Sequence, residues 1–129
     1  MNQRSVYLAV GIGGMVGAVS RYGVSAIIPS VHGFPYATLF TNLLGCFLLS
    51  FLLNHAALKL KLSKKMLLAV GTGAIGSFTT FSTFMIETVT LYNSAEVITA
   101  LAYIGISVIG GVLFCFLGYR AATGMGDQS

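Results

Sequence analysis

The sequence predicts an all-α integral membrane protein with four transmembrane helices in each chain. Of the 129 residues, 56% are hydrophobic and only 8% are charged, whereas soluble domains carry about 25% charged residues. So few charges cannot solvate the surface of a water-soluble globule, which argues against a soluble enzyme, a nucleic-acid-binding protein and a disordered chain. The seven Lys and Arg residues and the net charge of +4 are better explained as signals of membrane topology.

Four stretches are long and apolar enough to cross a bilayer, which takes about 20 residues. They are residues 6–28, 37–58, 66–91 and 97–119. Short connectors separate them, so we expect a single four-span membrane domain over residues 1–129. Cys46 and Cys115 lie inside apolar stretches and are predicted to be small buried hydrophobic residues, with no role in a disulfide or a metal site.

The first stretch carries small residues four positions apart, Gly13 and Gly17, which allow two helix backbones to approach closely. It also carries Arg21, at a depth similar to that of Glu87 in the third stretch. The two charges could pair with each other. Alternatively, Arg21 could form an electropositive vestibule that raises the local concentration of anions.

The third stretch is unusually polar at its centre. Residues 77–84 hold five hydroxyls and three phenyl rings, directly after three glycines in six residues. One or two hydroxyls could bond back to the carbonyls of their own helix. Five of them favour a helix that is interrupted near Gly76–Thr80 at mid-membrane, where irregular backbone is tolerated only if it is buried in protein or lines a cavity.

A set of side chains from three stretches, all polar except one phenyl ring, falls at one depth, roughly 7 to 15 Å below the same face of the membrane. They are Asn42, Phe81, Ser82, Thr83, Tyr103 and Ser107. Asn42 alone could simply hydrogen-bond a neighbouring helix, but the convergence indicates a polar track. Amide and hydroxyl donors without a full charge, together with positive ring edges, favour an anion as the transported species. The other half of the membrane has no comparable set, so a complete pore would need a second, inverted copy.

Basic residues are distributed unevenly between the two faces. The face that holds the amino terminus, the connector 59–65 and the carboxyl terminus, here face A, carries Arg4, Lys59, Lys61, Lys64, Lys65 and Arg120. The connectors on the opposite face, face B, carry no Lys or Arg. The positive-inside rule therefore predicts that face A is cytoplasmic.

Motifs in three of the stretches resemble those of the Fluc family of small four-span bacterial fluoride channels. The motifs are Gly17-Ala18-Val19-Ser20-Arg21-Tyr22, Thr38-Leu39-Phe40-Thr41-Asn42-Leu43-Leu44-Gly45 and Gly76-Ser77-Phe78-Thr79-Thr80-Phe81-Ser82-Thr83-Phe84. The resemblance covers essentially the whole chain. It implies an antiparallel, dual-topology dimer with two pores in the bacterial inner membrane, and passive export of fluoride that protects the cell from fluoride toxicity.

The resemblance also implies roles for individual residues. Main-chain carbonyls at Gly76 and Thr79, from both subunits, would hold a central structural Na⁺. Phe81 and Phe84 match the family's pore phenylalanines, Asn42 matches its pore asparagine, and Tyr103 and Ser107 match its polar track. We expect Thr83 to supply a further pore hydroxyl.

Two questions stay open at this point. A chain that inserts both ways should balance its Lys and Arg, yet six lie on face A, so a heterodimer with an oppositely biased paralogue is an alternative to the homodimer we favour. The main rival function is a proton-coupled small-multidrug-type exporter, which needs a titratable carboxylate in its pathway. Glu87 is the only acid in any of the four stretches, which disfavours that rival. A purely structural subunit would leave the polar cluster unexplained, and an intramembrane enzyme lacks partnered catalytic groups.

Overall fold

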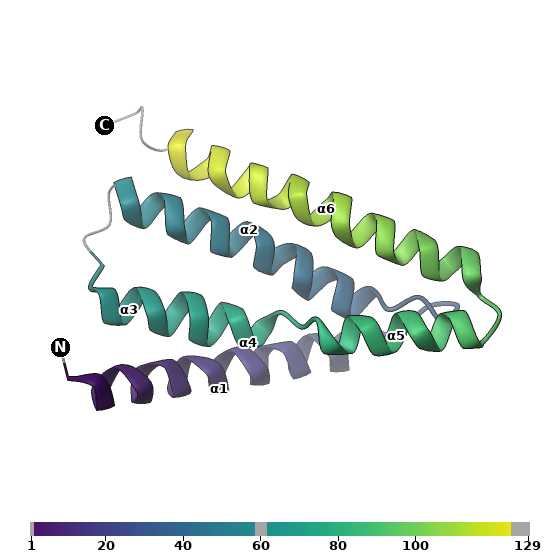
Figure 1. Cartoon of the computed structure of the whole chain (residues 1–129), viewed down its shortest axis with the longest axis horizontal. Coiled ribbons are helices and arrows are strands. Elements are labelled where there is room, and N and C mark those ends of the chain that lie inside the picture. Colours follow the sequence, from purple (N-terminus) through teal and green to yellow (C-terminus); the bar gives the residue numbers. More distant parts are fainter. Residues whose placement is uncertain (1, 59–61, 125–129) are drawn as a thin grey trace.

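The computed structural model describes residues 2–58 and 62–124, and these form four long helical rods (Figure 1). The first rod is α1 (Gln3–Ile27) and the second is α2 (Tyr36–Leu58). The third comprises α3 (Lys64–Leu68), η1 (Ala69–Ile75), α4 (Gly76–Phe78) and α5 (Ser82–Asn93), and the fourth is α6 (Val97–Gly124). As predicted, four helices are long and apolar enough to cross a membrane.

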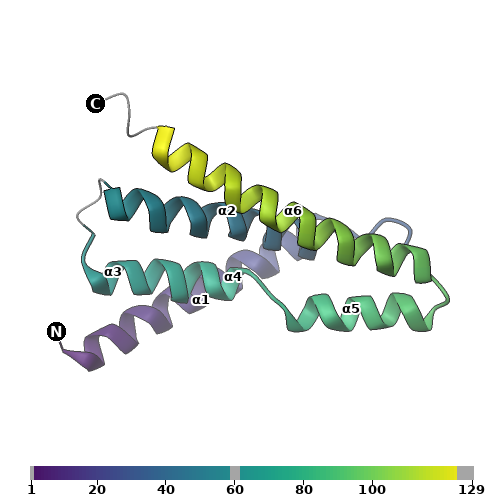
Figure 2. The ribbon, with the colours of Figure 1, turned by 45° about the horizontal axis from the view of Figure 1, so that its top comes forward.

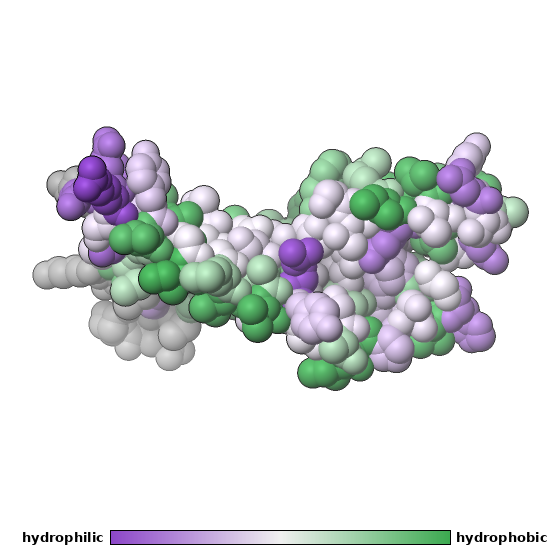
Figure 3. Space-filling model, turned by 90° about the horizontal axis from the view of Figure 1, so that it is seen from below, coloured by the Kyte–Doolittle hydropathy of each residue, from purple (hydrophilic) through white to green (hydrophobic). Residues whose placement is uncertain are grey.

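The rods run in alternating directions, so the start of α1, the end of α2, the start of α3 and the end of α6 meet at one end of the molecule (Figure 1). Arg4, Lys64, Lys65 and Arg120 belong to this end, which is face A. Lys59 and Lys61, also assigned to face A, lie outside the described residues. Hydrophilic residues gather at both ends of the visible surface, and a smaller hydrophilic group interrupts its middle (Figure 3).

The third rod is interrupted between α4 and α5 (Figure 2). Helical geometry ends at Phe78, Thr79 adopts an extended conformation with ψ 157°, and the helix resumes at Ser82. The sequence predicted an interruption at Gly76–Thr80, whereas Gly76 and Phe78 are helical and Phe81 is not. Before the interruption, η1 is a π-helix, which the sequence analysis did not anticipate. π-helical turns are rare and occur frequently at functional sites.

Close packing of α1 against η1 and α4 depends on glycine. A Cβ at Gly13 or Gly17 would collide with the carbonyl oxygen of Ala69 or Ala74, and a Cβ at Gly73 would lie 2.6 Å from the carbonyl oxygen of Val10. The small-residue repeat of the first stretch thus brings helices of the same chain together. This packing fixes α1 beside the end of α4.

The helices α2 and α6 form the other tightly packed pair. Ser50 Oγ donates a hydrogen bond of 2.7 Å to the carbonyl of Cys115, and Gly118 lies against the carbonyl of Phe47. Cys46 is half-buried and Cys115 is exposed, each as a free thiol. The prediction that both cysteines are buried was therefore wrong for Cys115, whose Sγ lies 3.7 Å from the Cys46 carbonyl on α2 but stays exposed because it lines a groove.

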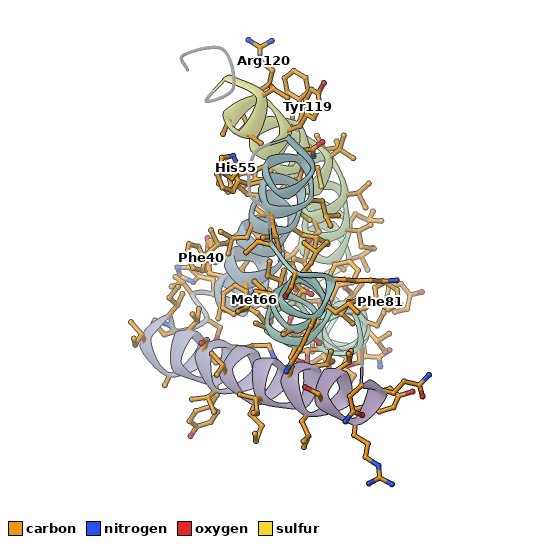
Figure 4. The ribbon with its side chains drawn as sticks, turned by 90° about the vertical axis from the view of Figure 1, so that its left-hand side faces the viewer. Phe40, His55, Met66, Phe81, Tyr119 and Arg120 are labelled. Carbon is orange, nitrogen blue, oxygen red and sulfur yellow. The ribbon has the colours of Figure 1, made fainter. Side chains whose placement is uncertain are left out.

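Large apolar side chains cover the outside of the bundle, such as Tyr7 on α1 and Ile98 on α6. Figure 4 shows the outward side chains of α1 pointing away from the other helices. Such a surface suits lipid, where apolar side chains gain nothing by turning inward and close backbone packing holds helices together. Tyr103, in contrast, is completely buried.

Candidate functional site

The interruption is held in place by Asn42 of α2. Its Nδ2 donates to the carbonyl of Thr80 at 2.9 Å, and its Oδ1 accepts from the Thr80 N–H at 2.8 Å. Backbone that leaves a helix must find other partners for its polar groups when water is absent. One amide side chain satisfies both groups of Thr80, and this leaves one N–H of the amide to donate elsewhere.

The carbonyls of Gly76 and Thr79 lose their usual helical partners at this point. In a continuous helix they would accept from the N–H groups of Thr80 and Thr83. The Thr80 N–H instead donates to Asn42 Oδ1, and the Thr83 N–H donates to Thr80 Oγ1 at 3.2 Å. Among the described residues, Gly76 O accepts one long bond, of 3.4 Å, from Thr79 Oγ1. The interruption thus leaves both carbonyls without their helical N–H partners.

A groove of about 340 Å³ lies beside these carbonyls. Its walls include Asn42, Gly45, Cys46, Gly76, Thr79 and Phe81. Phe81 projects outward from the third rod (Figure 4) and is 74% exposed. The released backbone therefore borders a hollow at the surface of the chain.

Hydroxyls cap the start of α5. Thr80 Oγ1 accepts from the Thr83 N–H and donates to Thr83 Oγ1 at 3.1 Å. This is the arrangement by which a threonine satisfies free N–H groups at a helix start. Thr83, predicted as a pore hydroxyl, thus lies directly against the interruption.

A second polar cluster joins α2, α5 and α6. The Glu87 carboxylate accepts from Thr38 Oγ1 at its Oε1 and from the Tyr103 hydroxyl at its Oε2, both at 2.8 Å. Thr38 is 7% exposed and Tyr103 is fully buried. Sequence reasoning placed Tyr103 correctly near this depth but missed Thr38 as a partner. The position of Thr38 one helical turn before Asn42, and so its depth in the membrane, was the one sequence signal that could have identified it.

Arg21 and Glu87 do not pair in the described chain. Arg21 Nε donates to the carbonyl of Ser77 at 3.2 Å, close to the end of α4. Glu87 is engaged by Thr38 and Tyr103. Of the two roles left open for Arg21, pairing with Glu87 is not seen among the described residues, because similar depth does not place two side chains on facing sides of their helices.

The aromatic rings connect the two polar clusters. The ring centroid of Phe84 lies 5.0 Å from that of Tyr103 and 6.0 Å from that of Phe81. One turn along α6, Ser107 Oγ is buried and has no hydrogen-bond partner among the described residues. Buried polar atoms without partners are uncommon in proteins. Asn42 and Thr83 thus both bond to Thr80, and Phe84 packs on Tyr103, whereas Phe81 points outward.

Known proteins resemble this chain along most of its length. The profile of the family described as "CrcB-like protein, Camphor Resistance (CrcB)" matches residues 8–119. The chain belongs to the CrcB-like family. It is 44% identical to "Fluoride-specific ion channel FluC 1" of Bacillus cereus over 119 residues, which cover 91% of this chain and 87% of that protein.

Other CrcB-like relatives agree. The chain is 43% identical to "Fluoride-specific ion channel FluC 2" of Listeria innocua, with 88% of each chain covered. It is 44% identical to "Fluoride-specific ion channel FluC" of Oceanobacillus iheyensis, with 89% of each covered. The predicted resemblance to the fluoride channel family is confirmed. With four helices able to span a bilayer, this CrcB-like chain is a multi-pass membrane protein.

Proposed function

We propose that this chain is a fluoride-selective channel that exports cytoplasmic fluoride by passive electrodiffusion. The observation that carries the proposal is 44% identity to a fluoride-specific ion channel over 91% of the chain. Fluoride that enters an acidified cell as neutral HF ionises inside and is trapped as the anion. A selective leak lets the negative interior drive it out, with about 2.3 kcal/mol per charge for each 100 mV.

Hydrogen-bond donors along α2, α5 and α6 form the fluoride pathway in this proposal. A small, strongly hydrated anion must exchange water for fixed donors and bind weakly enough at each to leave. The free N–H of Asn42, the hydroxyls of Thr83 and Ser107, and the ring edges of Phe81 and Phe84 supply donors or positive edges. The unpaired Ser107 Oγ supports this pathway, because a fluoride ion would accept its hydroxyl proton. The Tyr103 hydroxyl would join the pathway when it is not donating to Glu87.

The conducting unit is an antiparallel dimer of two such chains with two pores. The polar groups described above lie between the interruption and the face B end, at the start of α2 and along α5. An inverted copy would supply the other half of each pathway. The outward Phe81 and the groove beside Gly76 and Thr79 support a contact there with the second copy. A homodimer is the simpler assembly, and a heterodimer with an oppositely biased paralogue is the alternative that the Lys and Arg distribution keeps open.

The released carbonyls of Gly76 and Thr79 fit a structural Na⁺ at the centre of that dimer. Hard carbonyl oxygens are suitable ligands for a hard cation and need no carboxylate. Two oxygens from each chain, without helical partners and beside an open groove, would be shared by two copies. A sodium ion there supplies positive charge that compensates for the unpaired carbonyl dipoles. Asn42 and Thr80 occupy the N–H groups to which those carbonyls would otherwise bond.

Efflux from liposomes that contain the purified chain tests the proposal. Fluoride and chloride electrodes would follow release after a potassium ionophore is added, since electrodiffusion stops without a countercharge pathway. Rapid fluoride release, little chloride release and no dependence on a proton gradient are expected. Release that requires a proton gradient would favour a proton-coupled exporter instead.

A further inference from the structure

We propose that Arg21 is a positioning residue for conduction, acting through the carbonyl of Ser77 and not through its charge in a vestibule. The inference rests on the proposed function and deepens it. Arg21 Nε lies 3.2 Å from Ser77 O, and the bond joins residues 56 positions apart in the chain. It ties α1 to the last residues of α4, immediately before the backbone leaves the helix.

Packing of α1 places the guanidinium at this point. Gly17, one turn before Arg21, is buried, and a Cβ there would lie 3.0 Å from the N atom of Phe78. The α1 backbone therefore passes directly beside the end of α4. Arg21 itself is half-buried, so its bond to Ser77 is shielded from full competition by water.

The Ser77 carbonyl needs a partner because the helix stops. In a continuous helix it would accept from the Phe81 N–H, but Phe81 follows the extended residue Thr79. A carbonyl at the carboxyl end of a helix carries partial negative charge and is stabilised by a nearby cation. Arginine adds directional N–H donors that a lysine ammonium lacks.

The bond acts together with Asn42 on the far side of the interruption. Arg21 fixes residue 77 from α1, and Asn42 fixes residue 80 from α2. The carbonyls of Gly76 and Thr79 belong to the backbone held by these two anchors. Loss of either anchor lets this backbone rotate, which misdirects both carbonyls and displaces Phe81.

A vestibule role and a positioning role make different demands on the side chain. A vestibule role requires only a positive charge at the channel entrance, and lysine keeps that charge. The attraction of anions to this charge weakens as salt screens it. Positioning requires the guanidinium geometry, and salt has little influence on a half-buried hydrogen bond. Arg21→Lys and Arg21→Gln separate the two, with Arg4→Gln as a control that removes an exposed charge from the other end of α1.

The experiment measures fluoride efflux from liposomes at low and high ionic strength, with dimer assembly checked in detergent. Both Arg21 variants are expected to assemble and to lose roughly 10- to 100-fold in flux, as supporting residues around ion sites typically do. The loss should be the same at both ionic strengths, and Arg4→Gln should conduct normally. A defect confined to Arg21→Gln that shrinks at high salt, or wild-type flux in Arg21→Lys, would overturn the inference in favour of vestibule charge.

Two further outcomes are also decisive. Failure of both Arg21 variants to assemble would overturn the inference, because Arg21 would then serve folding. If the unmodified chain assembles but conducts no fluoride, the proposed function fails, and this is recorded separately from the behaviour of the variants.

Discussion

Asn42 binds Thr80 through both ends of its amide, at 2.9 Å to the carbonyl and 2.8 Å from the N–H. The two bonds replace those that Thr80 loses where α4 ends. Asn42, which the sequence suggested as a hydrogen-bond donor to fluoride, thus also has a structural role. It fixes the interrupted backbone and retains one N–H for an anion.

Replacing Asn42 by alanine should therefore reduce both stability and flux. Each Thr80 group left without a partner is expected to cost about 1–3 kcal/mol, and the released carbonyls lose their direction. Thermal unfolding in detergent and fluoride efflux would measure the two effects. Asn54→Ala is the matched control, because the bond that the described residues show for Asn54 lies within α2, to Ser50 O. Unchanged melting temperature and flux in Asn42→Ala would contradict this role.

Isoleucine variants of Phe81 and Phe84, the two phenylalanines assigned to the pore, should both lose fluoride flux but should differ in stability. Phe81→Ile and Phe84→Ile both remove a ring edge and are expected to lower fluoride flux. The two rings pair with each other at 6.0 Å, and Phe84 packs in addition on Tyr103, at 5.0 Å. Such aromatic pairs contribute about 0.5–1.5 kcal/mol. Phe84→Ile should therefore lower the melting temperature more than Phe81→Ile does, with Phe116→Ile on the outer face of α6 as control. Wild-type flux in both variants would contradict the assignment of Phe81 and Phe84 to the pore.

Glu87 should stabilise the helix bundle more than its place near a helix end suggests. Glu87→Ala leaves the hydroxyls of Thr38 and Tyr103 buried without an acceptor, at about 1–3 kcal/mol for each. Glu96→Ala removes an exposed carboxylate, just before α6, whose one side-chain hydrogen bond among the described residues comes from Thr99. Thermal unfolding of the two variants, measured side by side, should show a marked loss of stability for Glu87→Ala alone. Equal melting temperatures would argue against the cluster.

Glycine at position 17 should be irreplaceable, and glycine at position 11 should not be. Gly17→Ala forces α1 away from Ala74 and Phe78, so we expect a loss of stability of about 1–3 kcal/mol from overpacking. A Cβ added at Gly11, on the same helix, would meet nothing within 4 Å, and alanine there should be neutral or slightly stabilising. Thermal unfolding distinguishes the two, and tolerance of Gly17→Ala would mean that α1 packs differently.

Sodium should matter to assembly or activity if the released carbonyls hold it. Purification with a large organic cation in place of sodium is expected to weaken the dimer or reduce flux, and returning sodium should restore both. Thr79→Gly, which preserves the carbonyl, would serve as a control for the side chain. A chain stripped of sodium, verified by elemental analysis, that assembles and conducts normally would contradict the Gly76 and Thr79 site.

The sequence could predict depth along the membrane but not direction around each helix. Asn42, Thr83 and Tyr103 were placed at similar depth by counting residues. Asn42 and Thr83 both bond to Thr80, whereas Tyr103 bonds to Glu87 in a separate cluster. The same counting allowed Arg21 to pair with Glu87, but this pair does not form among the described residues, because the choice of partner depends on how each helix is rotated. The glycine repeat predicted close approach, and the structure identifies its partner as η1. The π-helix at Ala69–Ile75, against which α1 packs, was not predicted from the sequence.

The central claim is that this single polypeptide forms a fluoride channel. The most direct test is fluoride efflux from liposomes that contain only the purified chain, recorded with a fluoride electrode and with chloride measured in parallel. We predict rapid, ionophore-dependent release of fluoride with little release of chloride. A folded, dimeric preparation that releases no fluoride, or releases chloride equally fast, would contradict the account.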